Sequence, residues 1–204
     1  MLNLFSNLEI ETKTEATTNV VPDLLFVENY ITDLEHDDLI TAIDKNMWSD
    51  ELKRRVQHYG YKYDYKARNI NIGMKVKDLP EWADIIGRKL VDDGFFILPP
   101  DQLIVNEYMP GQGITDHIDC EPCFEDTIIS ISLGSYTTMN FTNKLTNERI
   151  PVILPPKSAV ILKGKSRYDW MHGIPPRKSD RINGLKRIRN RRISLTYRRV
   201  ILET

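Results

Sequence analysis

The sequence predicts an α+β fold in which two helices precede a jelly roll of short strands. Both helical patterns lie before residue 95, whereas the residues beyond 100 form short runs rich in β-branched side chains. Glycine, proline and asparagine interrupt these runs, as is typical between strands. Many short strands with few long helices favour a closed or double-sheet β architecture such as a jelly roll. Helices in front of strands make the overall class α+β.

The chain is expected to form one domain. Residues 1–20 are polar and rich in threonine, and they are expected to be a flexible lead-in to a single domain over residues 21–204. Two cysteines exclude a secreted disulfide framework, and no apolar run is long enough to span a membrane. The first residues lack the basic segment of a signal peptide. We therefore expect an intracellular protein, in the cytoplasm or the nucleus, with no membrane partner.

Two segments among the first hundred residues have helical signals. Thr32-Asp-Leu-Glu35 has the pattern of a capping box, and apolar residues behind it share one face. In the second segment, Pro80 suits a first helical turn and Gly94 suits the end of the helix. An apolar stripe follows this proline. Its members are Trp82, Ile85, Ile86 and Leu90.

Seven runs beyond residue 100 are predicted strands, because each is short, rich in β-branched residues and bounded by turn residues. They cover residues 103–109, 127–133, 137–141, 149–154, 159–162, 168–172 and 191–201. Side chains alternate between the two faces of a strand, so residues two apart in such a run can reach the same site.

Three side chains have the chemistry of a metal site. His117 and Asp119 are two apart, so in an extended segment both can reach one ion. His172, in WMHGI at the end of another predicted strand, completes a set of two histidines and one carboxylate. Such a set binds iron in non-haem Fe(II) oxygenases and leaves positions open for further ligands. The alternative is three ordinary residues, because lone histidines and His-x-Asp pairs are common by chance.

Cys120 and Cys123 compete for the same segment. A structural zinc site needs four ligands, and the chain has no second cysteine pair. A redox Cys-x-x-Cys is typical of a helix N-terminus, whereas this one follows a strand and precedes an acidic segment. We therefore interpret the two residues as loop thiols that are free to oxidise but have no essential role.

The last predicted strand carries two arginines on a polar face. Its polar positions are Arg192, Ser194, Thr196 and Arg198, which alternate with apolar residues. By pattern alone this would be the solvent face of an edge strand. Beside a His/Asp/His set, two arginines instead predict binding of a dianionic keto acid, because a buried carboxylate needs a charged partner. Asn106 and Tyr108 share a face of another strand and offer neutral hydrogen bonds to the same ligand.

The order of these motifs resembles the AlkB family of Fe(II)- and 2-oxoglutarate-dependent dioxygenases. The similar segments are NEYMPGQGITDHID, SISLGS, HGI and RRISLTYR, and the resemblance extends over roughly residues 50–200. It implies a double-stranded β-helix fold and oxidation by O₂, with 2-oxoglutarate as co-substrate. The implied catalytic iron would be held by His117, Asp119 and His172. The implied 2-oxoglutarate site consists of Asn106, Tyr108, Arg192 and Arg198, with Ser194 in support.

Within the family, the chain is similar to the AlkB domain of the animal tRNA wobble-uridine hydroxylases. The segments that carry this likeness are RRVQHYGYKYDY, the FEDTIISISLGS that follows His-Ile-Asp, and GKSRYDWMHGI. It favours tRNA as the nucleic-acid partner, hydroxylated on the side chain of the wobble uridine. The chain has no room for the RNA-recognition and methyltransferase domains of those enzymes, which leaves a separate methyltransferase partner open.

Three alternatives accompany this interpretation. The enzyme would repair N-alkylated bases in DNA or RNA by oxidative demethylation, it would oxidise a protein, or the fold would be a jelly roll that holds metal without turnover. The complete metal and arginine sets argue against the last alternative. A basic and aromatic segment, residues 54–65, argues against a protein substrate.

That segment predicts contact with nucleic acid. Two arginines precede tyrosines at positions 59, 61, 63 and 65, which at period two would share one strand face and stack on unpaired bases. A hairpin with packed aromatics is the alternative, and it suits Tyr63 and Tyr65 equally well. The family's lid over the substrate nucleotide falls on this segment. The residues expected to bind the substrate are therefore Arg54, Arg55, Tyr59 and Tyr61.

A basic run near the C-terminus predicts a phosphate-binding patch. Ten basic residues and one acidic residue, Asp180, lie between positions 177 and 199. Two of the ten are the arginines assigned to the keto acid. Those expected to contact phosphates are Arg177, Lys178, Arg181, Lys186, Arg187 and Arg189. The alternative is a solvated, mobile basic loop.

Overall fold

The computed structural model describes residues 16–17, 21–64, 67 and 69–202. The expected lead-in therefore lies outside the described residues, apart from a two-residue strand, β1. The helices, 3₁₀ turns and strands are, in chain order, β1 Ala16–Thr17, β2 Leu24–Val27, α1 Asp33–Asp44, β3 Val56–Tyr61, η1 Ile72–Met74, β4 Lys75–Lys77, α2 Glu81–Asp92, β5 Gln102–Tyr108, β6 Ile114–His117, η2 Glu121–Cys123, β7 Ile128–Gly134, β8 Thr137–Asn143, β9 Arg149–Leu154, β10 Ala159–Leu162, α3 Gly164–Tyr168, β11 Trp170–Ile174, β12 Ser179–Ile182, β13 Leu185–Ile188 and β14 Arg192–Arg198.

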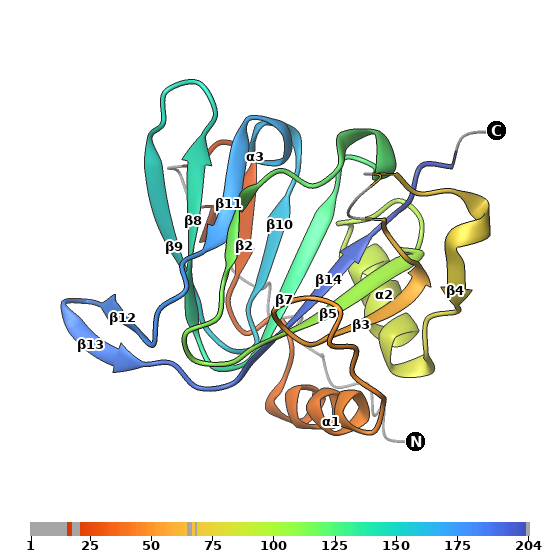
Figure 1. The fold of residues 1–204 in the computed structure, drawn as a ribbon, viewed down its shortest axis with the longest axis horizontal. Helices are drawn as coiled ribbons and strands as arrows, with labels where there is room; N and C mark the ends of the chain where they lie inside the picture. The colour runs from red at the N-terminus through yellow and green to blue at the C-terminus, as the bar shows by residue number, and fades with distance from the viewer. Residues whose placement is uncertain (1–15, 18–20, 65–66, 68, 203–204) are drawn as a thin grey trace, which may run out of the picture.

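The strands form two facing antiparallel sheets and one hairpin (Figure 1). The larger sheet has the order β1-β2-β10-β7-β14-β5-β3-β4, and the smaller has the order β6-β11-β8-β9. β12 and β13 pair only with each other and project from one end of the sandwich. Two sheets of antiparallel strands with supporting helices confirm the predicted α+β class and the double-stranded β-helix.

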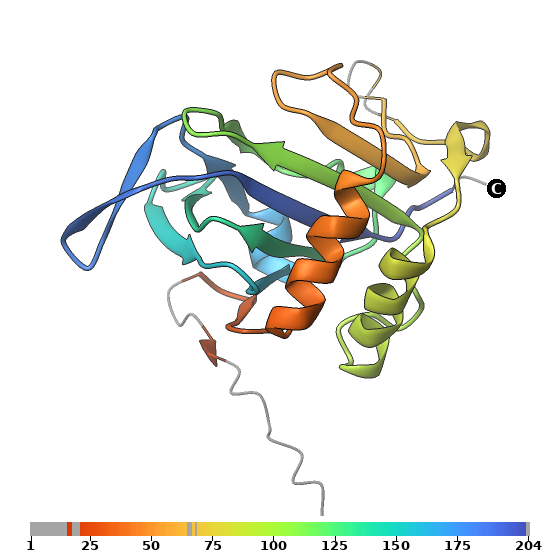
Figure 2. The ribbon, with the colours of Figure 1, turned by 90° about the horizontal axis from the view of Figure 1, so that it is seen from below.

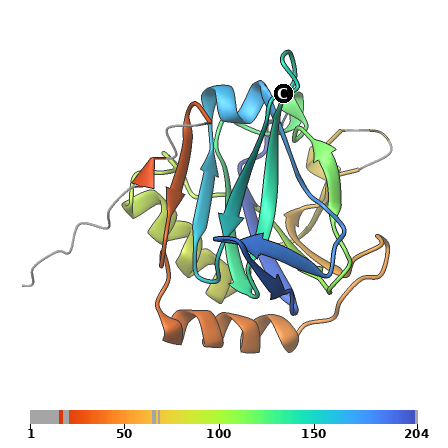
Figure 3. The same ribbon diagram turned by 90° about the vertical axis from the view of Figure 1, so that its left-hand side faces the viewer.

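Two apolar cores lie on opposite faces of the larger sheet. One fills the space between that sheet and the helices α1 and α2, which cover its outer face (Figures 2 and 3). Leu39 and Ile43 of α1, and Ile86 and Leu90 of α2, belong to this core. The other core lies between the two sheets and includes Phe141 of the smaller sheet. The candidate site opens into this second core.

Both predicted helices are present, and their signals act as expected. The backbone N–H of Glu35 donates to Thr32 Oγ1 at 3.1 Å, and that of Thr32 donates to Glu35 Oε2 at 2.7 Å, so the capping box is formed. α2 follows Pro80, and Gly94 beyond its end has a φ of 78°. One expected member of its stripe, Ile85, is exposed, because it points away from the sheet that the stripe covers.

β14 is a central strand and not an edge strand. It pairs with β5 on one side and with β7 on the other, with Ser194 opposite both Asn106 and Ser132. The solvent-face interpretation of its polar side chains is therefore wrong, because neighbouring strands cover both edges and the polar face looks into the space between the sheets. Within the described ranges, no helix combines the length and apolarity needed to cross a membrane.

Candidate active site

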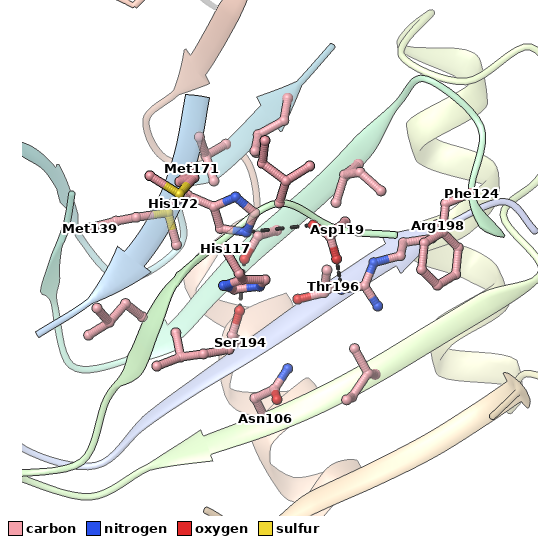
Figure 4. Close-up of a pocket in the computed structure, with 18 of the residues that line it drawn as sticks. Asn106, His117, Asp119, Phe124, Met139, Met171, His172, Ser194, Thr196 and Arg198 are labelled. Carbon is pink, nitrogen blue, oxygen red and sulfur yellow. Dashed lines mark hydrogen bonds and ion pairs between the residues drawn. The ribbon is translucent and has the colours of Figure 1, made fainter. Parts of the chain in front are cut away.

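Three ligand-type side chains converge where β6 and β11 pair (Figure 4). His117 on β6 lies opposite His172 on β11, and their ring centroids are 4.5 Å apart. Asp119 follows β6 after one residue, and its Oδ2 lies 3.5 Å from His172 Nε2. The ligand atoms of the three residues all lie within 4.8 Å of one another. The predicted trio is thus brought together at the spacing that one metal ion requires.

The protonation states of this trio suit metal binding. Burial raises the pKa of Asp119, but the positive charge of Arg198 is the main cause that outweighs it and holds that pKa well below its ordinary range. Burial and the neighbouring His117 lower the pKa of His172 to about 3. His117 Nδ1 lies 2.8 Å from Thr115 O, which leaves its Nε2 for a metal. At neutral pH the site therefore offers a carboxylate and a neutral His172 imidazole.

Arg192 is a buried cation without a charged partner. Its Nη2 donates to Ser132 Oγ at 2.8 Å, while Nε and Nη1 have no hydrogen-bond partner within the described part of the chain. Burial lowers the pKa of this guanidinium to about 10. An unpaired buried charge is unfavourable unless an anion joins it. The far carboxylate of a keto acid fits this position.

The neutral residues expected around a keto acid lie beside this cation. Tyr108 lies between two guanidinium groups, with Arg192 at 5.6 Å and Arg54 at 5.5 Å from its ring centre. Arg54 Nε also donates to Asn106 Oδ1 at 2.8 Å. Ser194 Oγ is hydrogen-bonded to Ser130 Oγ at 2.7 Å. Arg54, expected to bind the substrate, thus contacts the residues expected to bind the co-substrate.

Arg198 contacts the metal ligand. Its Nη2 donates to Asp119 Oδ1 at 2.5 Å, and its Nη1 donates to Gln102 Oε1 at 3.1 Å. The guanidinium also lies over the ring of Phe124. The two arginines of β14 therefore differ: Arg192 lacks an anionic partner, whereas Arg198 has one.

A cavity of about 430 Å³ is lined by the His/Asp/His trio and by Arg54, Asn106, Tyr108, Ser194 and Arg198. Arg192 is not a lining residue but lies next to one, with its guanidinium 5.6 Å from the ring centre of Tyr108. Asn106, Ser194 and Thr196 make its polar floor on the larger sheet, and Met139 and Met171 contribute an apolar wall on the smaller sheet (Figure 4). Tyr63, one of the period-two tyrosines, also lines the cavity, as does Lys144, which no sequence pattern distinguished. A polar end beside the metal ligands and an apolar wall suit a small acid with an organic substrate above it.

The expectation for Tyr59 is wrong, because Tyr59, Tyr61 and Tyr63 do not share a face. Gly60 has a φ of 73°, and the pairing of β3 with β4 shifts register between Gly60 and Tyr61. Tyr59 therefore packs on the helix side, where it is 2% exposed and donates to Gln57 Oε1 at 2.9 Å. Tyr61 packs against the core between the sheets, and Tyr63 lines the cavity. Tyr65 lies outside the described residues.

Arg55 lies on the opposite face of the larger sheet from the cavity. Its Nε and Nη2 donate to the carboxylate of Glu107 at 2.6 and 2.7 Å, and its guanidinium lies over the ring of Trp48. Glu107 follows Asn106 on β5, so strand alternation directs the two side chains to opposite faces. The expected contact of Arg55 with a nucleotide in the cavity is therefore not supported by its position.

Cys120 and Cys123, interpreted above as loop thiols that are free to oxidise, occur in the oxidised form. They form a disulfide, and both are buried beside Phe124 in the core between the sheets. The physical reason is the turn η2, which folds the segment after Asp119 back on itself and brings the two residues together. Neither sulfur belongs to the His/Asp/His cluster.

The basic run after His172 is a hairpin with one misassigned member. Arg189 is buried and donates to both oxygens of Asp180, at 2.5 and 2.8 Å, so the expectation that it contacts phosphate is wrong. The only acidic residue of this run thus holds the base of the hairpin together. The other five residues expected to contact phosphates are exposed. They are Arg177, Lys178, Arg181, Lys186 and Arg187.

Comparison with known proteins agrees with this geometry. The sequence profile of the 2OG-Fe(II) oxygenase superfamily matches residues 32–198. The chain belongs to this superfamily. The oxygenase is 39% identical over 178 residues to the uncharacterized protein L905 of Acanthamoeba polyphaga mimivirus, covering 87% of this chain and 84% of that protein. Iron and 2-oxoglutarate are the metal and co-substrate that the superfamily implies.

Two further relatives place the oxygenase in the AlkB family, related to ALKBH8. The Xenopus tropicalis tRNA (carboxymethyluridine(34)-5-O)-methyltransferase alkbh8 is 36% identical over 84% of this chain, which spans 28% of that protein. The Alkylated DNA repair protein ALKBH8 homolog of Arabidopsis thaliana is 34% identical over 88% of this chain and 59% of that protein. Among solved structures, OsALKBH1 superposes with a TM-score of 0.63 at 18% identity, covering 87% of this chain and 97% of that one.

Proposed function

We propose that this dioxygenase oxidises a modified nucleobase, and that its substrate is the side chain of a tRNA wobble uridine. The compact His/Asp/His trio beside an unpaired buried arginine carries the proposal for the chemistry. Relatives named for carboxymethyluridine at tRNA position 34, 36% and 38% identical to this chain, support the choice of substrate. Those relatives are about four times longer than the matched part, so their whole activity is not carried over.

His117, Asp119 and His172 would hold Fe(II). When bound with 2-oxoglutarate and O₂, the metal supplies the oxidation of a substrate C–H bond, and the keto acid leaves as succinate and CO₂. The orphaned Oδ2 of Asp119 and the buried neutral imidazole of His172 fit such an ion.

The remaining residues of the cavity position the two organic molecules. The two free donors of Arg192, which lies beside Tyr108 of the cavity lining, would pair with the far carboxylate of 2-oxoglutarate, and Asn106 and Tyr108 would supply neutral hydrogen bonds. Arg198 holds the Asp119 carboxylate in place. The apolar wall beside His172 excludes water from the reacting C–H bond.

A nucleic-acid substrate is supported by a basic route that leads from the cavity to the hairpin. Gln112 Nε2 donates to Lys53 O at 2.9 Å, and Gly111 N donates to Arg177 O at 3.2 Å. The loop after β5 therefore joins the segment that carries Arg54 to the exposed cations of β12 and β13. A nucleic-acid strand with one base in the cavity would place its phosphates along this route.

Oxidative demethylation of a base in DNA or RNA is the second candidate. It is favoured by a relative at 27% identity over 87% of this chain, the DNA N6-methyl adenine demethylase of Caenorhabditis elegans. The chemistry is shared, because oxidation of an N-methyl group gives a product that releases formaldehyde. Only the first candidate, hydroxylation of a tRNA wobble uridine, involves a methyltransferase partner, which a separate protein would supply.

Incubation with bulk tRNA and with methylated oligonucleotides, followed by mass spectrometry of nucleosides, separates the two. The wobble-uridine proposal expects a hydroxylated side chain to accumulate in tRNA and to be absent with the His117→Ala variant. Unchanged wobble uridines beside falling 1-methyladenosine or 3-methylcytidine would establish demethylation instead. Iron-dependent succinate formation without substrate, lost in the same variant, excludes a jelly roll that only binds metal.

A further inference from the structure

Arg167 is a buried cation behind the candidate metal site. It is 1% exposed and lies on α3, five residues before the metal ligand His172. Its Nη1 donates to Asp119 O at 2.9 Å and its Nη2 donates to Cys120 O at 3.2 Å. Both terminal nitrogens are thus used on backbone carbonyls and not on a carboxylate. Burying a guanidinium in this way is unfavourable by itself, which calls for a reason.

The carbonyls that Arg167 binds belong to a segment that no sheet holds. β6 ends at His117, and residues 118–120 belong to no strand. The two histidine ligands are fixed by the ladder between β6 and β11, whereas Asp119 lies just beyond it. Its backbone position therefore depends on contacts outside the ladder. The hydrogen bonds from Arg167 are the side-chain contacts to the backbone of this segment, where the disulfide at Cys120 and the hydrogen bond from Cys123 N to Cys120 O also act.

The helix that carries Arg167 is itself anchored. Lys165 N donates to Asp23 Oδ2 at 2.9 Å, and Ser166 Oγ donates to Asp23 O at 3.1 Å. Gly164 N donates to Asp126 Oδ1 at 2.9 Å. The chain then runs directly from α3 into β11. Arg167 thus connects an anchored support, continuous with the strand of His172, to the backbone of Asp119.

We propose that Arg167 is a positioning residue of the metal centre, whose guanidinium sets the backbone of Asp119 at the correct distance from His172. The proposal rests on the metal-binding part of the proposed function and not on the identity of the substrate. Residues that orient a metal ligand without touching the metal typically change metal affinity about 10- to 100-fold when replaced.

The sign of the effect distinguishes positioning from simple charge. Removing a cation near the site would, by relief of Coulomb repulsion alone, strengthen the binding of a divalent metal ion. Loss of positioning weakens it. If a variant that lacks the positive charge of Arg167 binds the metal more weakly, the loss of charge cannot be the cause, and the loss of positioning is.

The test is titration of the metal-free full-length protein with Mn²⁺, followed by calorimetry and by the electron paramagnetic resonance of free Mn²⁺. We expect Arg167→Met to bind Mn²⁺ about 10- to 100-fold more weakly than wild type. Arg167→Lys keeps the charge but has one ammonium group for two carbonyls, so it should recover part of the affinity. Arg88→Met, which removes an exposed arginine of α2, is the matched control and should bind as wild type does.

Equal or tighter Mn²⁺ binding by a folded Arg167→Met variant would overturn the proposal. Folding is checked by circular dichroism and by a melting transition above the temperature of the titration. Where Arg167→Met does not fold, Arg167→Lys decides, and wild-type affinity in that variant contradicts the proposal. Failure of the wild type itself to bind Mn²⁺ would refute the metal site and the proposed function, which is a separate outcome.

Discussion

Arg192 and Arg198 share the polar face of β14, yet their surroundings assign them different tasks. Arg198 is neutralised by Asp119, so its charge is satisfied before any ligand arrives. Arg192 has two free donors in a buried site, and each unsatisfied buried donor costs about 1–3 kcal/mol. The ligand-free protein therefore holds an unfavourable charge that a keto acid would relieve.

Replacing this arginine should raise stability and remove ligand binding together. We expect Arg192→Met without ligand to unfold with a free energy on the order of 1–3 kcal/mol higher than wild type, because the unpaired guanidinium is gone. With Mn²⁺ present throughout, addition of 2-oxoglutarate should further stabilise wild type but not the variant. Thermal and urea unfolding, each with and without 2-oxoglutarate, measure both effects.

Arg149→Met is the control for that experiment. Arg149 donates to the carboxylate of Asp116 and its side chain is 57% exposed, so its loss leaves the cavity unchanged. The control should keep the response to 2-oxoglutarate. An Arg192→Met variant that is stabilised by 2-oxoglutarate as much as wild type would show that this carboxylate subsite lies elsewhere.

Among the elements, β3 shows how one glycine redirects a strand. A Cβ on Gly60 would lie 1.8 Å from Asp101 O, and its φ of 73° is one that other residues rarely adopt. Gly184, at the turn of the β12–β13 hairpin, has a φ of 79° but no atom within 4 Å of such a Cβ. The two glycines share the left-handed backbone conformation, but only at Gly60 would an added Cβ collide with a neighbouring atom.

Alanine at these two glycines should therefore separate strain from collision. We expect Gly184→Ala to lower the free energy of unfolding by about 1–2 kcal/mol, through backbone strain alone. Gly60→Ala should lower it by about 2–4 kcal/mol, because the chain must also move away from Asp101. Urea unfolding of both variants gives the comparison. Equal losses would mean that the contact with Asp101 relaxes freely.

The turn η2 provides a second element-scale test. Its disulfide closes a loop of four residues, for which loop-closure entropy predicts about 2 kcal/mol of stabilisation. The Cys120→Ser, Cys123→Ser double variant should lose this amount and still bind Mn²⁺, because neither sulfur is among the ligand atoms and Arg167 still donates to the backbone of Asp119. Loss of Mn²⁺ binding in the double variant, with binding retained in His172→Ala, would mean that the metal uses the cysteines.

At the scale of the whole molecule, the hairpin β12–β13 extends the protein beyond the sandwich that contains the site (Figures 1 and 2). Lys186 and Arg187 on β13 are exposed, and Asp180 with Arg189 secures the hairpin at its base. Replacing the two exposed residues should thus alter its charge without unfolding it.

The variant Lys186→Gln, Arg187→Gln should bind a single-stranded oligonucleotide more weakly and with less salt dependence. Loss of two phosphate contacts lowers the slope of log K against log salt by about 1.4, since each contact contributes about 0.7 on single strands. Succinate formation without substrate should not change. The control Lys45→Gln, Arg88→Gln removes two exposed cations near the helices. If the control changes the slope of log K against log salt by the same amount, the effect is due to the net charge of the protein and not to the hairpin.

The sequence by itself determined the fold class and the chemistry of the site. Alternation at period two places His117 with Asp119, and Arg192 with Arg198, on common faces wherever the backbone is extended. The capping box at Thr32 and the end of α2 near Gly94 likewise depend on neighbours in the sequence. Such local rules hold without knowledge of what packs against the segment.

Only the tertiary structure decided which members of a pattern reach the cavity. The left-handed backbone at Gly60 sends Tyr59 into the core beneath α2 and leaves Tyr63 at the cavity. Arg189 is buried and donates to Asp180. Arg167 donates to Asp119 O, which lies 48 residues earlier in the chain. These outcomes depend on contacts between distant segments. Periodicity cannot predict them, because it describes the faces of one strand and not what covers each face.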